Sequence, residues 1–366
     1  MISNGQTSAE TITHMKAGMV AEEKQTVIGW DIGGAHLKMA RTENGQITHA
    51  RTVKAPMWLG LDQVRAALDQ FRPLFQGNPI HVFTMTGELS DGFPSRGAGV
   101  RHILDFIKAE FGGDDLQVYG GRAGFVDLSD AYDLGPDIAS ANWHATAALS
   151  ASIKGEGLFV DMGSTTTDIL AFQNGRLCNN GYSDAERLLT GELVYTGFTR
   201  SALIGIAERV PVRGTMTPLM NEYFANTADL GRILGTLDEA DDQYPAADRR
   251  AKSRGGSIGR IARMVGRDGT DLSEGEWIDV ARWFAEHQLR MIHDGAFRVS
   301  GNAALSPVAP VVGAGIGRPQ IMQLAKRLER PYVDFGMIIP AASNEIRDQA
   351  SKAAPAAAVA LLWSKS

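Results

Sequence analysis

The sequence has a single cysteine, Cys178, among 366 residues. One cysteine cannot form an intramolecular disulfide or a cysteine-rich metal site, so a reducing cytoplasm is the expected compartment. No apolar run reaches the roughly 18 residues that a membrane-spanning helix needs. Residues 1–25 also lack the apolar core of a signal peptide, and we expect them to form a disordered tail or a partner arm.

Basic residues are too few to suggest a nucleic-acid partner. Asp and Glu number 42 against 36 Lys and Arg, which gives a formal net charge of −6. With 44% hydrophobic residues, the chain is long enough for two domains with substantial cores. We therefore expect small-molecule substrates and neither a nucleic-acid nor a membrane partner, and a homo-oligomer stays open.

The stretch 158–170, LFVDMGSTTTDIL, is the one around which the rest of the chain is organised. An apolar run ends at Asp161, and Gly163 opens a turn of small hydroxyl residues. Glycine lets a backbone approach a ligand closely, and successive N–H groups in such a turn can bind phosphate oxygens. A carboxylate beside them can hold a hydrated Mg²⁺. The stretch is equally compatible with an ordinary hairpin that has a polar turn.

The same pattern occurs earlier, in VIGWDIGGAHLKMARTENGQI. Asp161 follows Asp31 by 130 positions, and Asn174-Gly175 follows Asn44-Gly45 by the same 130. Asn-Gly between alternating strands is a strong hairpin signal. A hairpin unit repeated at one spacing indicates two similar domains that face each other.

A late strand and glycine turn, APVVGAGIG at 309–317, completes a set of three motifs. Together they resemble the two phosphate motifs and the adenosine motif of the sugar kinase, Hsp70 and actin superfamily. Within it, the strings TMTGELSDGF, ASANWHATA, VDMGSTTTDI and TGELVYTG resemble the hydantoinase/oxoprolinase-related family linked to tetrahydromethanopterin C1 metabolism. The resemblance runs from about residue 27 to the C-terminus.

This resemblance implies an α/β fold of two duplicated actin-like domains with a ligand cleft between them. It also implies a magnesium-assisted transferase of methanofuran biosynthesis, in which the phenol of γ-glutamyltyramine displaces pyrophosphate from an aminomethylfuran diphosphate. On that interpretation ATP is not required. The alternatives are an ATP-dependent kinase or oxoprolinase-like amidohydrolase, which the same three motifs serve elsewhere, and a non-catalytic actin-like assembly or chaperone module.

Asp31 and Asp161 are the predicted metal ligands, because carboxylates on two facing hairpins can hold one Mg²⁺ against a polyphosphate. Turn capping is the structural alternative for both. The predicted phosphate or cofactor contacts come from the turns and their surroundings: Gly33, Gly34, Gly163, Ser164, Thr165, Thr166, Asp168, Gly313 and Gly315.

Lys38 stands in the repeat where Asp168 stands in the second unit, and we predict that it contacts phosphate as a point charge, with a solvated strand lysine as the alternative. A phenol has an ordinary pKa of about 10, so its attack needs help with deprotonation. Asp31, Glu88, Asp91 and Glu192 are the candidate catalytic carboxylates, although surface positions or caps explain the last three equally well. Tyr195, Arg200 and Asn142 enter only through the family strings.

Apolar periodicity predicts the main elements. Strands are expected at 80–85, 117–119 and 309–312, and helices at 61–75, 100–111, 140–152, 274–299, 318–328 and 344–363, the last kinked or restarted at Pro355. The predicted domains are 26–156, against which 344–366 packs back, and 157–343, with a helical insertion at about 205–275.

Overall fold

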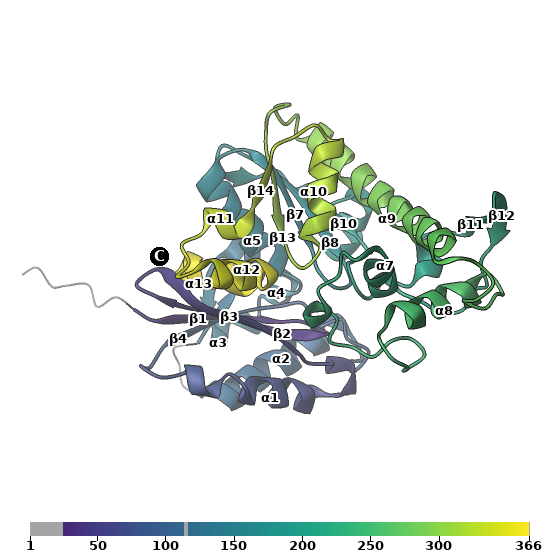
Figure 1. The fold of residues 1–366 in the computed structure, drawn as a ribbon. Coiled ribbons are helices and arrows are strands. Elements are labelled where there is room, and N and C mark those ends of the chain that lie inside the picture. Colours follow the sequence, from purple (N-terminus) through teal and green to yellow (C-terminus); the bar gives the residue numbers. More distant parts are fainter. Residues whose placement is uncertain (1–24, 113–115, 366) are drawn as a thin grey trace, which may run out of the picture.

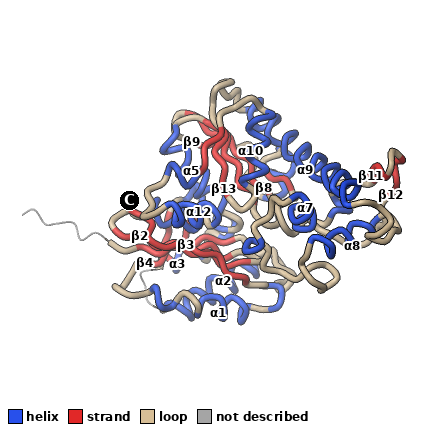
Figure 2. The backbone as a smooth tube through the Cα atoms, viewed as in Figure 1, coloured by secondary structure: helices blue, strands red, loops and turns tan. Residues whose placement is uncertain are grey.

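Two mixed β-sheets, each started by one of the repeated hairpins, organise the computed structural model, which describes residues 25–112 and 116–365 (Figures 1 and 2). The predicted tail lies outside these residues, apart from Gln25. The first sheet has the order β3-β2-β1-β4-β5-β6. Its strands are β1 (Val27–Ile32), β2 (His36–Glu43), β3 (Gln46–Lys54), β4 (Ile80–Met85), β5 (Gln117–Tyr119) and β6 (Phe125–Asp127).

The second sheet repeats this start with the order β10-β8-β7-β13-β14, and β9 pairs with β8. Its strands are β7 (Gly157–Met162), β8 (Thr167–Gln173), β9 (Arg176–Leu177), β10 (Leu193–Val194), β13 (Val311–Ala314) and β14 (Tyr332–Asp334). In both sheets the first strand is antiparallel to its hairpin partner and parallel to the strand on its other side. The sequence repeat is therefore a structural repeat.

Two helices, α5 (Asn142–Lys154) and α13 (Ala354–Trp363), pack between the sheets in one apolar cluster that takes side chains from both. Gly29 on β1 allows this packing, because a Cβ there would clash with the backbone of Ala356 and with Ala360. The C-terminal helix therefore lies against the first sheet. The outer faces are covered by α1 (Leu61–Asp69) and α2 (Arg96–Phe111) on one sheet and by α9 (Glu274–Asn302) and α10 (Arg318–Arg327) on the other.

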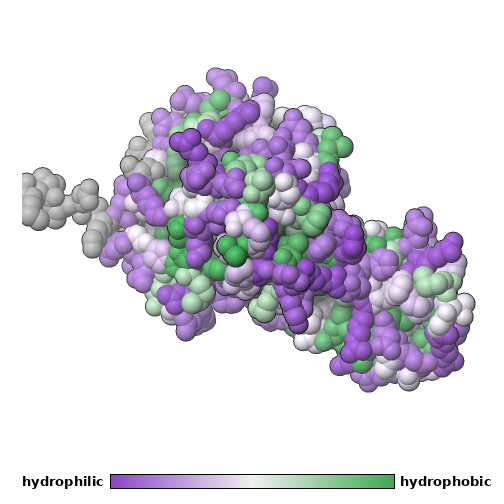
Figure 3. Space-filling view, turned by 90° about the horizontal axis from the view of Figure 1, so that it is seen from above, coloured by the Kyte–Doolittle hydropathy of each residue, from purple (hydrophilic) through white to green (hydrophobic). Residues whose placement is uncertain are grey.

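A lobe built from residues 203–284 has its own apolar cluster. It contains β11 (Arg209–Val212), β12 (Thr215–Pro218), α7 (Thr227–Leu234), α8 (Arg254–Met264) and the first half of α9. Figures 1 and 3 show the lobe standing off from the two-sheet body. Short helices complete the chain: α3 (Leu128–Ala131), α4 (Gly135–Ile138), α6 (Asp184–Thr190), α11 (Phe335–Ile338) and α12 (Asn344–Lys352).

The predicted strands at 80–85 and 117–119 are confirmed, as is a restart of the last helix near Pro355, since α12 ends at Lys352 and α13 begins at Ala354. Several predicted boundaries differ. Helix α2 begins at Arg96 and not at residue 100, because Ser95 caps it, and α9 runs on to Asn302. Three other boundaries are wrong for local reasons. Helix α1 ends at Asp69, whose carbonyl cannot receive the next helical hydrogen bond because Pro73 has no N–H to donate. Strand β13 starts only after Pro310, which has no N–H to donate. Helix α5 starts after Ser140, whose φ is 54°.

The insertion is not purely helical. Strands β11 and β12 form a hairpin whose two turn residues, Arg213 and Gly214, have φ of 48° and 79°. Two consecutive positive φ values are the requirement of a type I′ turn, which Asn-Gly signals more clearly than Arg-Gly does. The domain boundaries stay a prediction. Over the described residues, no helix combines the length and the apolar character needed to cross a bilayer.

Candidate active site

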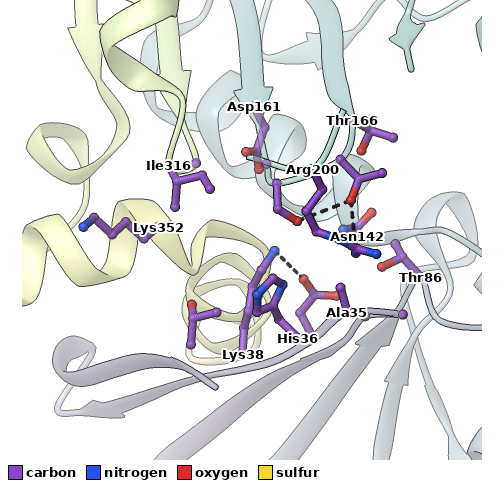
Figure 4. A pocket seen from close by; sticks show the side chains of 18 of the residues that line it. Ala35, His36, Lys38, Thr86, Asn142, Asp161, Thr166, Arg200, Ile316 and Lys352 are labelled. Carbon is purple, nitrogen blue, oxygen red and sulfur yellow. Dashed lines mark hydrogen bonds and ion pairs between the residues drawn. The ribbon is translucent and has the colours of Figure 1, made fainter. Parts of the chain in front are cut away.

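A cavity of about 950 Å³ lies where the two hairpin turns face each other. Figure 4 shows Lys352 and Ile316 at one end and Asn142 and Thr86 at the other, with Lys38 and His36 rising from the first sheet toward Asp161 on the second (Figure 4). Of the predicted residues, the cavity is lined by Asp31, Gly33, Gly34, Lys38, Asp91, Asp161, Gly163, Ser164, Thr165, Thr166, Asp168 and Gly315. The fold thus gathers residues separated by almost 300 positions.

The two turns are closed by equivalent hydrogen bonds. Gly33 N–H donates to the carbonyl of His36, and Gly163 N–H donates to the carbonyl of Thr166, both at 3.0 Å. These glycine N–H groups are therefore used within the turns. In the described part of the chain, the N–H groups of Gly34, Ser164 and Thr165 donate to no protein acceptor. Free backbone donors from both turns line one cavity, which suits an anion with several oxygens.

The string TGELVYTGFTR supports the second turn. A Cβ on Gly197 would clash with the backbone of Ser164 and Thr165, and Arg200 N–H donates to the Ser164 carbonyl at 2.8 Å. The Arg200 guanidinium enters the cavity, 3.4 Å from Thr165 Oγ1 and 4.9 Å from the ring centroid of Trp58. A fixed guanidinium therefore lies beside the free N–H donors.

The third motif reaches the cavity only in part. Gly315, with φ of 84°, lines it and packs against Asp161 and Met162, and Gly317 N–H donates to the Met162 carbonyl at 2.9 Å. Gly313 lies within β13 beside the Tyr332 ring and is not among the lining residues. The predicted contact from Gly313 is thus not supported, because its role is to admit that ring.

The charges beneath the turns are arranged in pairs. Lys38 Nζ lies 3.0 Å from Asp31 Oδ2, and Asp168 pairs with the buried Arg187. Burial raises the pKa of Asp161 to about 7, a shift that Lys38 opposes and that the like charges of Asp168 and Asp31 increase. No cation lies within ion-pair distance of Asp161 among the described residues. Asp161 is therefore the cavity carboxylate that most needs a positive ligand.

Asp161 gives a testable pH dependence. In the unfolded chain its pKa returns to 3.8, so between about pH 4 and 7 the folded protein holds a proton that the unfolded chain has lost. The free energy of unfolding therefore falls as pH rises through this window. We expect Asp161→Asn to remove this part of the slope in urea unfolding of ligand-free protein. An identical slope in both proteins would contradict the assignment.

Two predicted bases do not reach the cavity. Glu88 is fully buried, and its Oε1 accepts a hydrogen bond from Ser140 Oγ at 2.6 Å. Glu192 accepts from the N–H groups of Asn180 and Gly181 and from Thr190 Oγ1, so its carboxylate ties a loop to β10. Neither lines the cavity, whereas Asp91 does and is exposed.

Several cavity residues carry no signal in the sequence pattern. His36, directly after the first turn, is 9% exposed, and burial, with the cations Lys38, Arg200 and Lys54 adding to it, lowers its pKa to about 3. The Nζ of Lys352, on α12, lies 3.0 Å from Oδ1 of Asp241. Asp241 belongs to a segment of the insertion that also contacts the first sheet. There Gln243 Nε2 donates to the Thr52 carbonyl at 3.2 Å. Such neighbours become visible only once the tertiary structure is formed.

A magnesium ion shared by Asp31 and Asp161 does not fit this arrangement, because the Lys38 ammonium already lies against Asp31. The described residues also contain no group of three or more His, Cys, Asp or Glu side chains placed to hold a metal. Asp161 alone, a buried carboxylate that lacks a cation, fits an ion that arrives with a diphosphate. The predicted role of Asp31 as a metal ligand is thus not supported.

Comparison with known proteins agrees with the geometry. Residues 80–334 match the hydantoinase/oxoprolinase family. The chain is 30% identical over 296 residues to the (4-{4-[2-(gamma-L-glutamylamino)ethyl]phenoxymethyl}furan-2-yl)methanamine synthase of Methanocaldococcus jannaschii, covering 80% of this chain and 87% of the synthase. It is 30% identical to the synthase of the same name from Methanococcus vannielii, over 46% of this chain and 74% of that one.

A solved structure supports the fold. The nucleotide-free structure of an ATP-dependent acetone carboxylase aligns with a TM-score of 0.53 and 10% identity, over 92% of this chain and 70% of that chain. At this identity the likeness concerns the fold alone. The predicted two-sheet α/β fold of the actin-like type is confirmed.

Proposed function

The chain belongs to the hydantoinase/oxoprolinase family, and from this membership we propose that it is the transferase of methanofuran biosynthesis that joins a phenol to a furylmethyl group. The substrates proposed are γ-glutamyltyramine and an aminomethylfuran-methanol diphosphate. The observation that carries the proposal is the pair of facing turns, whose free N–H donors and neighbouring cations line one cavity. The match to the two synthases supports the choice of substrates.

The reaction proposed is a substitution at carbon. The phenol oxygen bonds to the furylmethyl carbon, the bond from that carbon to the diphosphate oxygen breaks, and the diphosphate leaves with the electron pair. The furan ring can delocalise positive charge as the bond breaks, so the site must mainly stabilise the departing anion. Lys38, Arg200 and the N–H groups of Gly34, Ser164 and Thr165 are the groups available for this.

We include Mg²⁺ in the proposal as a cofactor of this transferase reaction. Bound together with the diphosphate, Mg²⁺ would neutralise charge on the leaving group, with Asp161 as the carboxylate available to it. The proton of the phenol needs an acceptor, and of the predicted catalytic carboxylates only Asp31 and Asp91 line the cavity. The proposed substitution reaction does not consume ATP.

One observation favours a second candidate, an ATP-dependent kinase or amidohydrolase. The turn around Gly315 and Ile316 still lines the cavity, beside the Ile346 and Gln349 side of α12. A nucleoside at this end would place its phosphates against the same two turns. Nucleotide turnover therefore separates the two candidates.

The test is an assay of purified protein with aminomethylfuran diphosphate, γ-glutamyltyramine and Mg²⁺, with and without ATP. We expect equal amounts of pyrophosphate and of the aryl ether, detected by mass, in both conditions. Omission of the phenolic amine is the control for simple hydrolysis. Absence of ether in both conditions, together with substrate-dependent ATP hydrolysis, would replace the transferase by the second candidate.

A further inference from the structure

The two hairpins carry opposite charges at one equivalent position beneath their turns. In the first, Asp31 on β1 is paired with Lys38 on β2. In the second, Asp161 on β7 is paired with Asp168 on β8 in the same register. The duplication thus places an ammonium in one half where the other half has a carboxylate, and both sites border one cavity.

Lys38 is held by Asp31 and is also attracted by carboxylates of the other half. Its Nζ lies 3.0 Å from Asp31 Oδ2, and the side chain is 22% exposed. Burial alone would lower the pKa of Lys38, but the attraction of Asp31 and Asp161, with a smaller part from Asp168, raises it above the ordinary value. The ammonium therefore stays charged at neutral pH, at the place where the two sheets come together.

Asp31, Asp161 and Asp168 border the same cavity, and Arg187 pairs with only one of them, Asp168. Carboxylate oxygens are the ligands that Mg²⁺ and other hard divalent cations prefer. The Lys38 ammonium, within ion-pair distance of Asp31, takes up that carboxylate and repels a divalent ion from the others.

We propose that Lys38 is a built-in cation that takes the place beside Asp31 of a divalent ion shared with Asp161. The ligand-free protein then binds no divalent ion there, and it gains such a site when Lys38 is replaced by the residue of the second hairpin. An ammonium fixed to a strand cannot leave with a product, unlike a metal ion. This inference concerns the ligand-free protein and stands whether or not the transferase assignment is correct.

The test titrates Mn²⁺ into ligand-free wild type, Lys38→Asp and Lys38→Met, with free Mn²⁺ followed by electron paramagnetic resonance at pH 7.5. Mg²⁺ competition shows that the site accepts both ions. We expect Lys38→Asp to bind one Mn²⁺ about 100-fold more tightly than wild type does. Adding Asp161→Asn to Lys38→Asp should return the affinity to the wild-type value, which separates this site from acidic surface groups.

Circular dichroism shows whether each variant is folded. If Lys38→Asp does not fold, Lys38→Met carries the test, because it removes the cation and adds no charge. We expect Lys38→Met to bind Mn²⁺ about 10-fold more tightly than wild type. The inference is overturned if wild type already binds one Mn²⁺ in an Asp161-dependent manner, or if the folded variants bind no more tightly than wild type.

Discussion

Lys38→Met is expected to lower kcat/KM for the proposed transfer by about 100- to 1,000-fold, the range seen when one preorganised group that stabilises a developing anion is removed. Lys38 Nζ is fixed by Asp31 at 3.0 Å, so the charge needs no reorganisation as the diphosphate departs. Methionine keeps the length and apolar stem of the side chain. Initial rates of pyrophosphate release over a range of diphosphate concentrations measure the effect.

Lys54→Met is the matched control. Lys54 lies on the neighbouring strand β3, 4.7 Å from the centroid of the Tyr244 ring, and is not among the residues that line the cavity. It tests the loss of one positive charge near the site without the loss of a side chain that lines the cavity. We expect less than a threefold change, by analogy with exposed charges that act through solvent. Equal losses in the two variants would show that Lys38 acts only through long-range charge.

Most of the fold could be predicted because its signals are local. The 130-residue offset between Asp31 and Asp161 needs only the sequence, and it gave both hairpins and the two-sheet architecture. The sequence Ser-Asp-Ala-Glu at 183–186 has the four-residue spacing of a helix capping box. The structure contains this capping box, with the Glu186 carboxylate accepting a hydrogen bond from the Ser183 N–H. The failures were equally local: Pro73 and Pro310 lack an N–H and so set boundaries that apolar periodicity does not register.

The part of the site that could be predicted from the sequence is the part formed by the two hairpin turns. Gly34, Ser164 and Thr165 follow from the motif, whereas the partner of each charge does not. Glu192 illustrates the difference: its family string indicated a functional carboxylate, and the structure uses it to fix a loop by three hydrogen bonds. Lys352 illustrates the opposite case, since nothing near it in the sequence predicts its contact with Asp241. Pairings across domains depend on the packing of α12 and the insertion.

The largely buried pair of Arg187 and Asp168 is expected to be costly to break. The Arg187 side chain is 2% exposed, and its guanidinium lies 4.3 Å from the centroid of the Trp143 ring. Burial raises the pKa of Asp168, and Arg187 opposes that shift. Arg187→Met leaves this largely buried carboxylate without its cation. We expect the free energy of unfolding, measured in urea at pH 7, to fall by about 3–5 kcal/mol.

Arg122 serves as a control for Arg187, because it has the same kinds of partner but lies at the surface. It also pairs with an aspartate, Asp137, and lies 4.6 Å from the centroid of an aromatic ring, Tyr182, but it is 66% exposed. Arg122→Met should therefore cost at most about 1 kcal/mol. The deficit of Arg187→Met should shrink at acidic pH, where protonation removes the unpaired charge of Asp168, and it should shrink likewise in Arg187→Met/Asp168→Asn. A deficit that is independent of pH and unchanged in the double variant would assign the loss to packing against Trp143 and not to the buried charge.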